Sequence, residues 1–315
     1  MTLRSWGTGA AYAAGWAAVQ RLPERSAQRL FTAGADLAGR RPGKGIIRLR
    51  ANLARVVAAT PALAGTDLDE LTRAAVRSYA RYWQEVFRLP VTPTERIVRD
   101  MHMADDARLR AAYAAGRGVI LALPHTGNWD HAGAWLVATG IPFTTVAERL
   151  EPASLFDRFV AFREGLGMEV LPLTGGELPP FEVLASRLRA GGMLCLLADR
   201  DLTTGGVPVQ FFGATATMPA GPALLAVRTG AALLPVTLQF DDPSPWCGQV
   251  HPQVLDPGTG RLAERVTAMT QSMADAFAAG IAAHPADWHM LARLWQEDLD
   301  PARRARRGQP VAVPQ

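Results

Sequence analysis

The sequence contains few of the residues that stabilise disulfide-rich or cysteine-rich metal-binding domains. Two cysteines, Cys195 and Cys247, occur in 315 residues. Two thiols cannot build a disulfide framework or a zinc site made of cysteines. We therefore expect a fold that depends on its hydrophobic core, in a reducing compartment. Lysine is also scarce, since Lys44 is the only one, and arginine supplies nearly all of the positive charge.

The sequence lacks a long uninterrupted hydrophobic run. Its apolar N-terminal stretch, residues 5–19, is rich in alanine and glycine and is shorter than the roughly 20 residues that a membrane-spanning helix requires. No clean cleavage site of a secretory signal follows it. Trp6, Tyr12 and Trp16 suit a helix that lies at a membrane interface. An ordinary buried helix with a solvated arginine face is the alternative.

Charge is distributed unevenly along the chain. The overall composition, 49% hydrophobic and 20% charged, is that of a folded globular protein. Residues 1–55 contain ten arginine or lysine residues against two acidic ones, whereas the formal net charge of the whole chain is only +4. An anionic partner, such as a phospholipid surface or a nucleic acid, should meet this end. No interleaved aromatic pattern of a nucleic-acid-binding module accompanies the arginines, which favours the membrane.

The pattern of hydrophobic residues changes near residue 110. Before this point apolar residues recur every three or four positions, most regularly between Leu68 and Val86, which predicts amphipathic helices separated by prolines. After it, apolar runs that predict buried strands alternate with stretches that predict helices. The predicted strands span residues 118–123, 143–147, 169–173, 193–198 and 233–240, and the predicted helices span residues 128–138, 152–166, 179–189 and 219–228.

This alternation predicts an α/β fold with a mostly parallel central sheet flanked by helices. We assign residues 111–299 to this domain, residues 1–110 to a helical, membrane-associating N-terminal region, and residues 300–315 to a disordered basic tail. In such sheets ligands bind beyond the carboxyl ends of the parallel strands. The functional residues should therefore follow the predicted strands.

Several common catalytic motifs are missing. The sequence has no G-x-S-x-G elbow, no G-x-x-x-x-G-K-[ST] loop and no G-x-G-x-x-G turn after a predicted strand. A serine hydrolase, a P-loop nucleotidase and a classical dinucleotide-dependent enzyme all lose support. Cys195 lies inside an apolar run, where a buried structural thiol is expected rather than a nucleophile.

A compact group of polar residues, His-Thr-Gly-Asn-Trp-Asp at 125–130, follows the first predicted strand of the α/β region. Gly127 permits a tight turn, and Thr126 or Asn128 can cap the next helix. A neutral histidine can take a proton from a hydroxyl nucleophile. We expect His125 to act as a general base, with Asp130 facing it to fix the tautomer and stabilise the imidazolium.

Two other uses of this motif stay open. The histidine and the aspartate can serve only as a cap or as a hydrogen bond in the core. His125, Asp130 and His131 are all metal-binding residue types, but no H-E-x-x-H or cysteine–histidine spacing accompanies them. We therefore expect no metal at this site.

Charged residues follow two other predicted strands. Asp199, Arg200 and Asp201 come after the strand that ends at residue 198, and Glu148 and Arg149 come after the strand that ends at residue 147. Parallel strands would bring these ends to the same edge as His125, where an acid can complete the site and arginines can bind phosphate. A solvated loop with a surface ion pair is the alternative.

Together these segments resemble the bacterial membrane acyltransferases that include the lipid A lauroyl and myristoyl transferases, most closely the actinobacterial phosphatidylinositol mannoside acyltransferases. The resemblance covers residues 118–290 and, more diffusely, the N-terminal helices. It rests on segments that recur in order: His-Thr-Gly-Asn-Trp-Asp at 125–130, Val-Ala-Glu-Arg-Leu at 146–150, Phe-Arg-Glu at 162–164, Leu-Thr-Gly-Gly at 173–176, Ala-Asp-Arg-Asp-Leu at 198–202, Phe-Phe-Gly at 211–213, Met-Pro-Ala-Gly-Pro at 218–222 and His-Pro-Ala-Asp-Trp at 284–288.

The resemblance implies transfer of a fatty acyl group, palmitoyl above all, from acyl-CoA or an acyl carrier protein to the 6-hydroxyl of a mannose on phosphatidylinositol mannoside. It implies that His125 is the base, that Asp130 is its partner and that Asp199, where close relatives carry glutamate, belongs to the active site. It also implies that Arg163 lies near the donor. The further substrate-binding candidates are Thr126, Asn128, Glu148, Arg149 and Arg200.

The implied protein is a peripheral enzyme on the cytoplasmic face of the cell membrane, with acyl-CoA as co-substrate and no bound cofactor. Its basic N-terminal helices would lie against anionic headgroups. Another glycolipid or a lysophospholipid is the alternative acceptor, and an acyl thioesterase would use the same base. The third possibility is a non-catalytic protein that binds lipid or nucleic acid, and nucleic-acid binding would weaken steeply with salt.

Overall fold

The computed structural model describes residues 14–148, 153–173, 180–201, 205–241 and 245–299. Trp6, Tyr12, Arg149 and the predicted basic tail at residues 300–315 lie outside the described residues.

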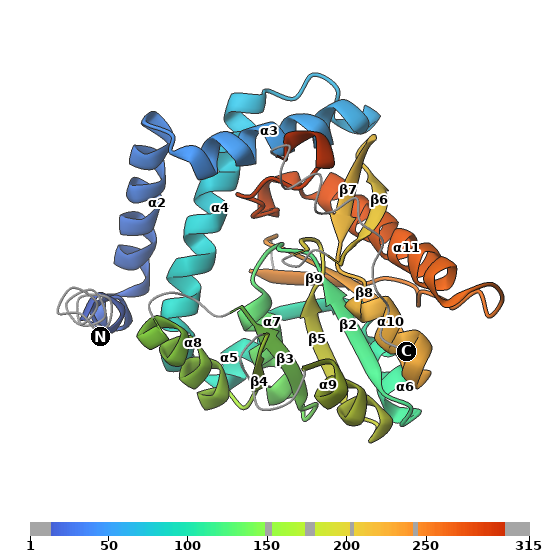
Figure 1. The fold of residues 1–315 in the computed structure, drawn as a ribbon. Helices are drawn as coiled ribbons and strands as arrows, with labels where there is room; N and C mark the ends of the chain where they lie inside the picture. Colours follow the sequence, from blue (N-terminus) through green and yellow to red (C-terminus); the bar gives the residue numbers. More distant parts are fainter. Residues whose placement is uncertain (1–13, 149–152, 174–179, 202–204, 242–244, 300–315) are drawn as a thin grey trace.

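A seven-stranded sheet forms the centre of the molecule, in the order β1-β9-β8-β2-β5-β3-β4 (Figure 1). The strands from β8 to β4 run parallel, whereas β9 is antiparallel to β8 and β1 pairs parallel with β9. The mostly parallel α/β fold is therefore confirmed. The strands are β1 (Met101–Ala104), β2 (Val119–Leu123), β3 (Phe143–Ala147), β4 (Glu169–Pro172), β5 (Met193–Leu197), β8 (Ala232–Gln239) and β9 (Trp246–Val250).

Helices cover both faces of this sheet, which explains why its central strands β2 and β5 are apolar at every position. Val119, Leu121 and Leu123 of β2 join the core on one face, and Ile120 and Ala122 join the core on the other. The first face packs against α5 (Thr94–Arg99), α6 (Asp106–Ala114), α7 (Trp129–Ala138) and α8 (Ala153–Gly165), and the second against α9 (Pro180–Arg189), α10 (Gly221–Thr229) and α11 (Leu262–Ala283).

Three long helices precede the sheet. They are α2 (Glu24–Arg40), α3 (Lys44–Ala59) and α4 (Leu68–Arg88), with short 3-10 turns at Pro61–Leu63 and Leu89–Val91. Helices α2 and α3 both pack against α4. The predicted helix from Leu68 to Val86 is confirmed as α4, and the side chain of Asp67 caps it by accepting two backbone N–H groups.

The predicted boundary at residue 110 falls inside the sheet-containing part of the fold. Strand β1 begins at Met101, so the sheet starts within the region that we expected to be helical. Helix α3 is also tied to the C-terminal segment, because Asn52 Nδ2 donates hydrogen bonds to the carbonyl oxygens of Met290 (2.7 Å) and Ala292 (3.0 Å). The predicted division would therefore separate α3 from a C-terminal segment to which it is hydrogen-bonded.

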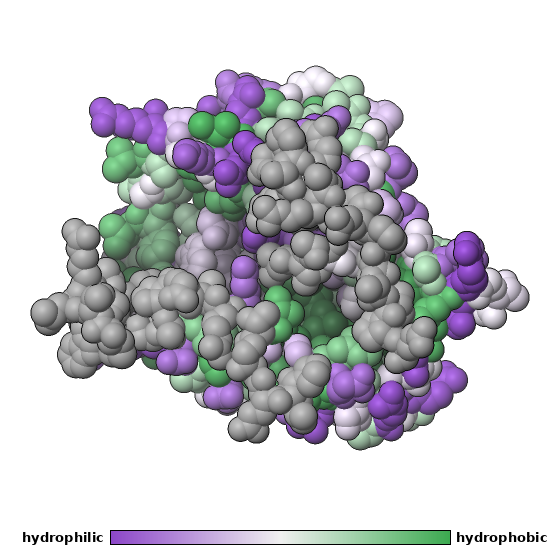
Figure 2. All heavy atoms as spheres, in the orientation of Figure 1, coloured by the Kyte–Doolittle hydropathy of each residue, from purple (hydrophilic) through white to green (hydrophobic). Residues whose placement is uncertain are grey.

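An apolar hollow of about 970 Å³ lies between α2 and α4. Figure 2 shows hydrophobic residues gathered in this hollow, and Figure 1 shows the two helices side by side. Trp16, Phe31 and Trp83 are among its lining residues. Leu30, which also lines it, is 57% exposed, and Leu37 on the same helix is 65% exposed. No helix in the described part of the chain combines the length and apolarity needed to span a bilayer.

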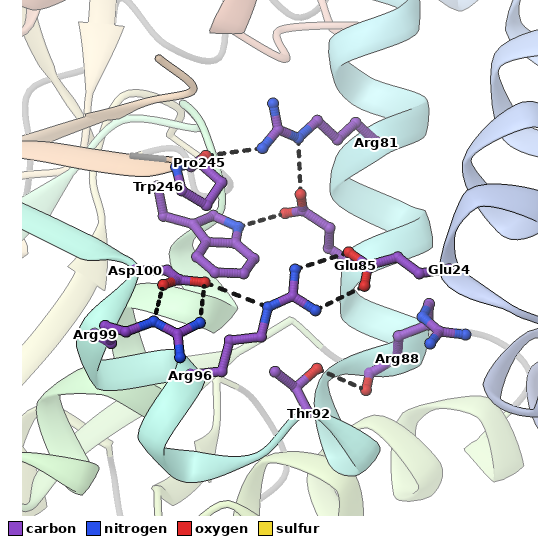
Figure 3. Close-up of polar contacts among 10 residues, drawn as sticks. All are labelled: Glu24, Arg81, Glu85, Arg88, Thr92, Arg96, Arg99, Asp100, Pro245 and Trp246. Carbon is purple, nitrogen blue, oxygen red and sulfur yellow. Dashed lines mark hydrogen bonds and ion pairs between the residues drawn. The ribbon is translucent and has the colours of Figure 1, made fainter. Parts of the chain in front are cut away.

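Polar contacts fix the start of α2 and the C-terminal part of α4 to the rest of the fold (Figure 3). Arg96 donates to both carboxylate oxygens of Glu24 at 2.7 and 2.8 Å, which holds the start of α2 against α5. Glu85 on α4 accepts hydrogen bonds from Trp246 Nε1 on β9 (2.8 Å) and from Arg81 Nε (2.7 Å). Helix α4 is thereby held in a fixed position beside the sheet.

The structure also contains elements that the sequence did not predict. Strands β1 and β9 extend the sheet at one side. Strands β6 (Val207–Phe211) and β7 (Ala214–Met218) form a separate antiparallel hairpin. The 22-residue helix α11 packs against this hairpin and against β8.

Candidate active site

His125 lies two residues beyond β2, at the carboxyl edge of the parallel strands. The turn after it requires glycine, because Gly127 has a φ of +55° and a Cβ there would lie 2.8 Å from the carbonyl carbon of Leu238 on β8. The side chain of Asn128 then caps α7 by accepting the N–H of His131 at 2.9 Å, and it donates to Glu85 at 2.7 Å. The turn that carries the imidazole is thus fixed between β8 and α4.

Sheet register brings Asp199 to His125. Strands β2 and β5 are parallel neighbours, and Leu123 lies opposite Leu197. His125 and Asp199 each follow these partners by two residues, so they leave the sheet at matching positions. Asp199 Oδ1 lies 2.5 Å from His125 Nδ1, and Asp199 Oδ2 accepts the backbone N–H of His125 at 2.9 Å.

Asp199 is fully buried and stays ionised because its donors outweigh the cost of burial. Burial by itself raises the pKa of this carboxyl, but the charge and hydrogen bonds of His125, together with a hydrogen bond from Trp288, hold the pKa below its usual value. The indole N–H of Trp288 donates to Oδ2 at 3.0 Å. A carboxylate at Nδ1 assigns the proton to that nitrogen, which leaves Nε2 of His125 as the proton acceptor.

The predicted pairing of His125 with Asp130 is wrong. Asp130 lies in the first turn of α7 and binds Arg163 on α8, through Nε to Oδ1 (2.7 Å) and a second nitrogen to Oδ2 (3.2 Å). The hydroxyl of Tyr82 on α4 donates to Asp130 Oδ2 at 2.8 Å. Burial works against the charge of Arg163, but the carboxylate of Asp130 keeps the pKa of Arg163 above its usual value. Asp130 therefore joins α7 to α4 and α8.

A cavity of about 390 Å³ is lined by His125 and by charged and apolar side chains. Glu148, Arg163, Arg200 and Asp201 are its charged lining residues. Val146, Leu173, Phe181, Leu184, Leu197 and Leu225 are among its apolar ones. A smaller apolar hollow of about 70 Å³ between α7 and the sheet shares Val146, Arg163 and Leu197 with this cavity. Cys195 lines that hollow, and burial raises the pKa of its thiol, as expected of a structural cysteine.

Two of the predicted substrate-binding residues have structural partners instead. Thr126 is buried, and its hydroxyl oxygen accepts the backbone N–H of Leu238 at 3.1 Å. Asn128 is buried as the cap of α7. Glu148, Arg163 and Arg200 do line the cavity. No sequence pattern placed Tyr82 beside Asp130 or Trp288 beside Asp199, although Trp288 ends the His-Pro-Ala-Asp-Trp segment at 284–288.

The geometry is that of a histidine base oriented by a carboxylate. Within the described ranges no three His, Cys, Asp or Glu side chains are grouped as a metal ion would need. Residues 1–297 match the model of the bacterial lipid A biosynthesis acyltransferases. The chain belongs to this family. It is an acyltransferase, and the predicted family is confirmed.

Curated relatives are similar over nearly the whole length. A phosphatidylinositol mannoside acyltransferase of Mycolicibacterium smegmatis is 55% identical over 298 residues, which cover 94% of both chains. A phosphatidylinositol mannoside acyltransferase of Mycobacterium tuberculosis is 52% identical over 297 residues, which cover 94% of this chain and 90% of the relative.

Proposed function

We propose that this acyltransferase moves a fatty acyl group, palmitoyl above all, from acyl-CoA to the 6-hydroxyl of a mannose on phosphatidylinositol mannoside. The observation that carries the proposal is the position of the His125–Asp199 pair. His125 lines a cavity whose wall contains arginine side chains as well as apolar ones. The names of the relatives at 52 and 55% identity support the choice of acceptor.

In the proposed reaction His125 is a general base and no protein nucleophile is needed. Its Nε2 takes the proton of the mannose hydroxyl while the hydroxyl oxygen attacks the thioester carbonyl carbon. The C–O bond forms, the tetrahedral intermediate collapses, and the C–S bond breaks. The imidazolium then returns its proton to the departing thiolate of CoA. Asp199 stabilises the imidazolium and keeps the ring oriented.

Negative charge builds up on the thioester oxygen during the attack, and a hydrogen-bond donor is needed to stabilise it. We assign this role to Arg200. The N–H of Gly127 already donates to the carbonyl oxygen of Asp287 at 3.0 Å. The guanidinium of Arg163 is already balanced by Asp130. Arg200 follows β5 next to Asp199 and lines the cavity with His125. It can offset charge on the oxyanion or on the phosphates of the donor.

The apolar part of the cavity supports a long acyl chain as the transferred group. Leu197 at the end of β5 is 37% exposed although the rest of its strand is largely buried. It borders both the main cavity and the apolar hollow beneath α7. Apolar walls of this kind bind hydrocarbon and leave the polar end of the cavity to the reacting groups.

The N-terminal helices support attachment to an anionic membrane surface, which we propose to be the cytoplasmic face of the cell membrane. Arg25 and Arg29 of α2 are exposed on the same helix as Leu30 and Leu37. The acidic residues of α2 are neutralised, because Glu24 pairs with Arg96 and Asp36 pairs with Arg77. Exposed arginines beside exposed leucines are typical of helices that contact anionic lipid.

Product analysis tests the proposed function. Labelled palmitoyl-CoA and the full chain are incubated with vesicles that contain phosphatidylinositol mannoside, or with vesicles that lack it. We expect labelled, acylated glycolipid only when the acceptor is present, at a rate that falls as salt screens the anionic surface. Free palmitate at the same rate without acceptor would identify a thioesterase. Transfer to a lysophospholipid in preference to the mannoside would replace the acceptor that we propose.

A further inference from the structure

Trp288 occupies a position from which it can influence the His125–Asp199 pair directly. It is fully buried, and its indole Nε1 donates to Asp199 Oδ2 at 3.0 Å. The same oxygen accepts the backbone N–H of His125 at 2.9 Å. Two donors on Oδ2 leave Oδ1 as the oxygen that meets the imidazole, 2.5 Å from Nδ1.

The segment that carries Trp288 is locked beside the histidine turn. The N–H of His289 donates to the carbonyl oxygen of His125 at 2.8 Å, and the N–H of Gly127 donates to the carbonyl oxygen of Asp287 at 3.0 Å. The Asp287 carboxylate accepts a hydrogen bond from the hydroxyl of Ser78 on α4 at 2.6 Å. Contacts on both sides of Trp288 thus fix the indole relative to the turn.

We propose that Trp288 is a positioning residue, whose indole N–H orients Asp199 and limits how strongly the carboxylate holds the proton on His125. A carboxylate that loses a hydrogen-bond donor has a higher proton affinity. It therefore stabilises the neighbouring imidazolium more strongly. This inference rests on the proposed function, in which His125 must be neutral to act as a base. Without the indole N–H, His125 should stay protonated to a higher pH.

Trp295 provides a matched control for this role. It is also fully buried, and its ring centroid lies 6.2 Å from that of Trp288. Its indole N–H donates to the carbonyl oxygen of Phe211 at 2.8 Å and not to Asp199. Trp295→Phe and Trp288→Phe therefore each remove one indole and one buried hydrogen bond, but only Trp288→Phe removes a donor from the carboxylate.

Other titratable and charged groups near the pair are the same in both variants. His289 is held neutral, since burial and the charge of His125 lower its pKa to about 3. Among the described residues, Glu148, Arg163, Arg200 and Asp201 are the other charged groups that line the cavity, and the carboxylate of Asp287 next to Trp288 is hydrogen-bonded to Ser78. A difference between the two variants can therefore be assigned to the indole donor.

The test compares the pH dependence of kcat and the titration of the His125 ring by nitrogen NMR in the parent, Trp288→Phe and Trp295→Phe. For Trp288→Phe we expect two midpoints to move up by about one pH unit: that of the acid limb of the kcat profile and that of the His125 ring titration. We also expect kcat to fall roughly tenfold. The KM for palmitoyl-CoA should stay unchanged. Trp295→Phe should move neither midpoint, although it lowers the stability of the fold.

An unchanged midpoint in Trp288→Phe, a downward shift, or an equal shift in Trp295→Phe would overturn the positioning role. The NMR titration needs no turnover, so the two proposals can fail separately. A parent without acyl transfer contradicts the proposed function even if the ring titration shifts as expected. An active parent whose ring titration does not shift in Trp288→Phe contradicts only the role of Trp288.

Discussion

Replacing Asp199 with asparagine is expected to lower kcat by about 10³-fold or more, even though the side chain keeps its shape. Asp199 Oδ2 receives two N–H donors, from His125 and Trp288, so the amide oxygen of an asparagine must remain there. The amide nitrogen then faces His125 Nδ1, which can only accept. The proton moves to Nε2, and the ring can no longer take a proton from the acceptor hydroxyl.

The matched variant for this prediction is Asp199→Glu, which retains a carboxylate. It should keep far more of the activity than Asp199→Asn, as measured by initial rates of palmitate transfer at saturating donor. Thermal unfolding of both variants shows whether the fold is intact. Equal activity in the two variants would mean that the carboxylate does not set the tautomer of His125.

Replacing Asp130 with asparagine is expected to lower the free energy of unfolding by about 3 kcal/mol, because it leaves the charge of Arg163 without its partner. Asp130 is 2% exposed and the side chain of Arg163 is 18% exposed, so water can replace the lost carboxylate only in part. Tyr82 would also lose the charged acceptor of its hydroxyl. Urea unfolding followed by tryptophan fluorescence measures the change.

A double variant separates the charge effect from a general loss of packing. Asp130→Asn combined with Arg163→Gln removes both charges, and it should recover a substantial part of the stability lost in Asp130→Asn alone. The acid limb of the pH–rate profile should not move in Asp130→Asn, since Asp130 binds Arg163 and Tyr82 rather than His125. A shifted acid limb, or a loss below about 1 kcal/mol, would contradict this role.

The parallel strands could be predicted from the sequence because burial on both faces makes them largely apolar runs, and β2 and β5 are apolar throughout. The predicted ranges for β2, β3, β4, β5 and β8 agree with the structure to within one residue at each end. Strand β1 is only four residues long and contains His102, so no such run marks it. The hairpin of β6 and β7 turns at Phe212 and Gly213, with φ values of 49° and 76°. Phenylalanine rarely adopts this conformation, and the usual Asn-Gly or Asp-Gly signal is absent.

The location of the site could be predicted from the sequence, but the carboxylate that pairs with His125 could not. Polar residues after two apolar strands indicated the carboxyl edge of the sheet, and His125 and Asp199 both lie there. The spacing of five residues between His125 and Asp130 suggested a pair, but it does not determine which way the first turn of α7 faces. The true partner is 74 residues away and depends on β5 lying next to β2, which is a property of strand order. Sequence spacing alone contains no information on that order.

His125 is the proposed base of the transfer, and a comparison of the parent with His125→Ala tests this role most directly. The measurement is single-turnover transfer of labelled palmitate to phosphatidylinositol mannoside, with binding of a non-reactive thioether analogue of palmitoyl-CoA measured alongside. We expect transfer to fall by at least roughly 100-fold while the affinity for the donor analogue is retained. Transfer at the parent rate in His125→Ala would contradict the role of His125 as the base.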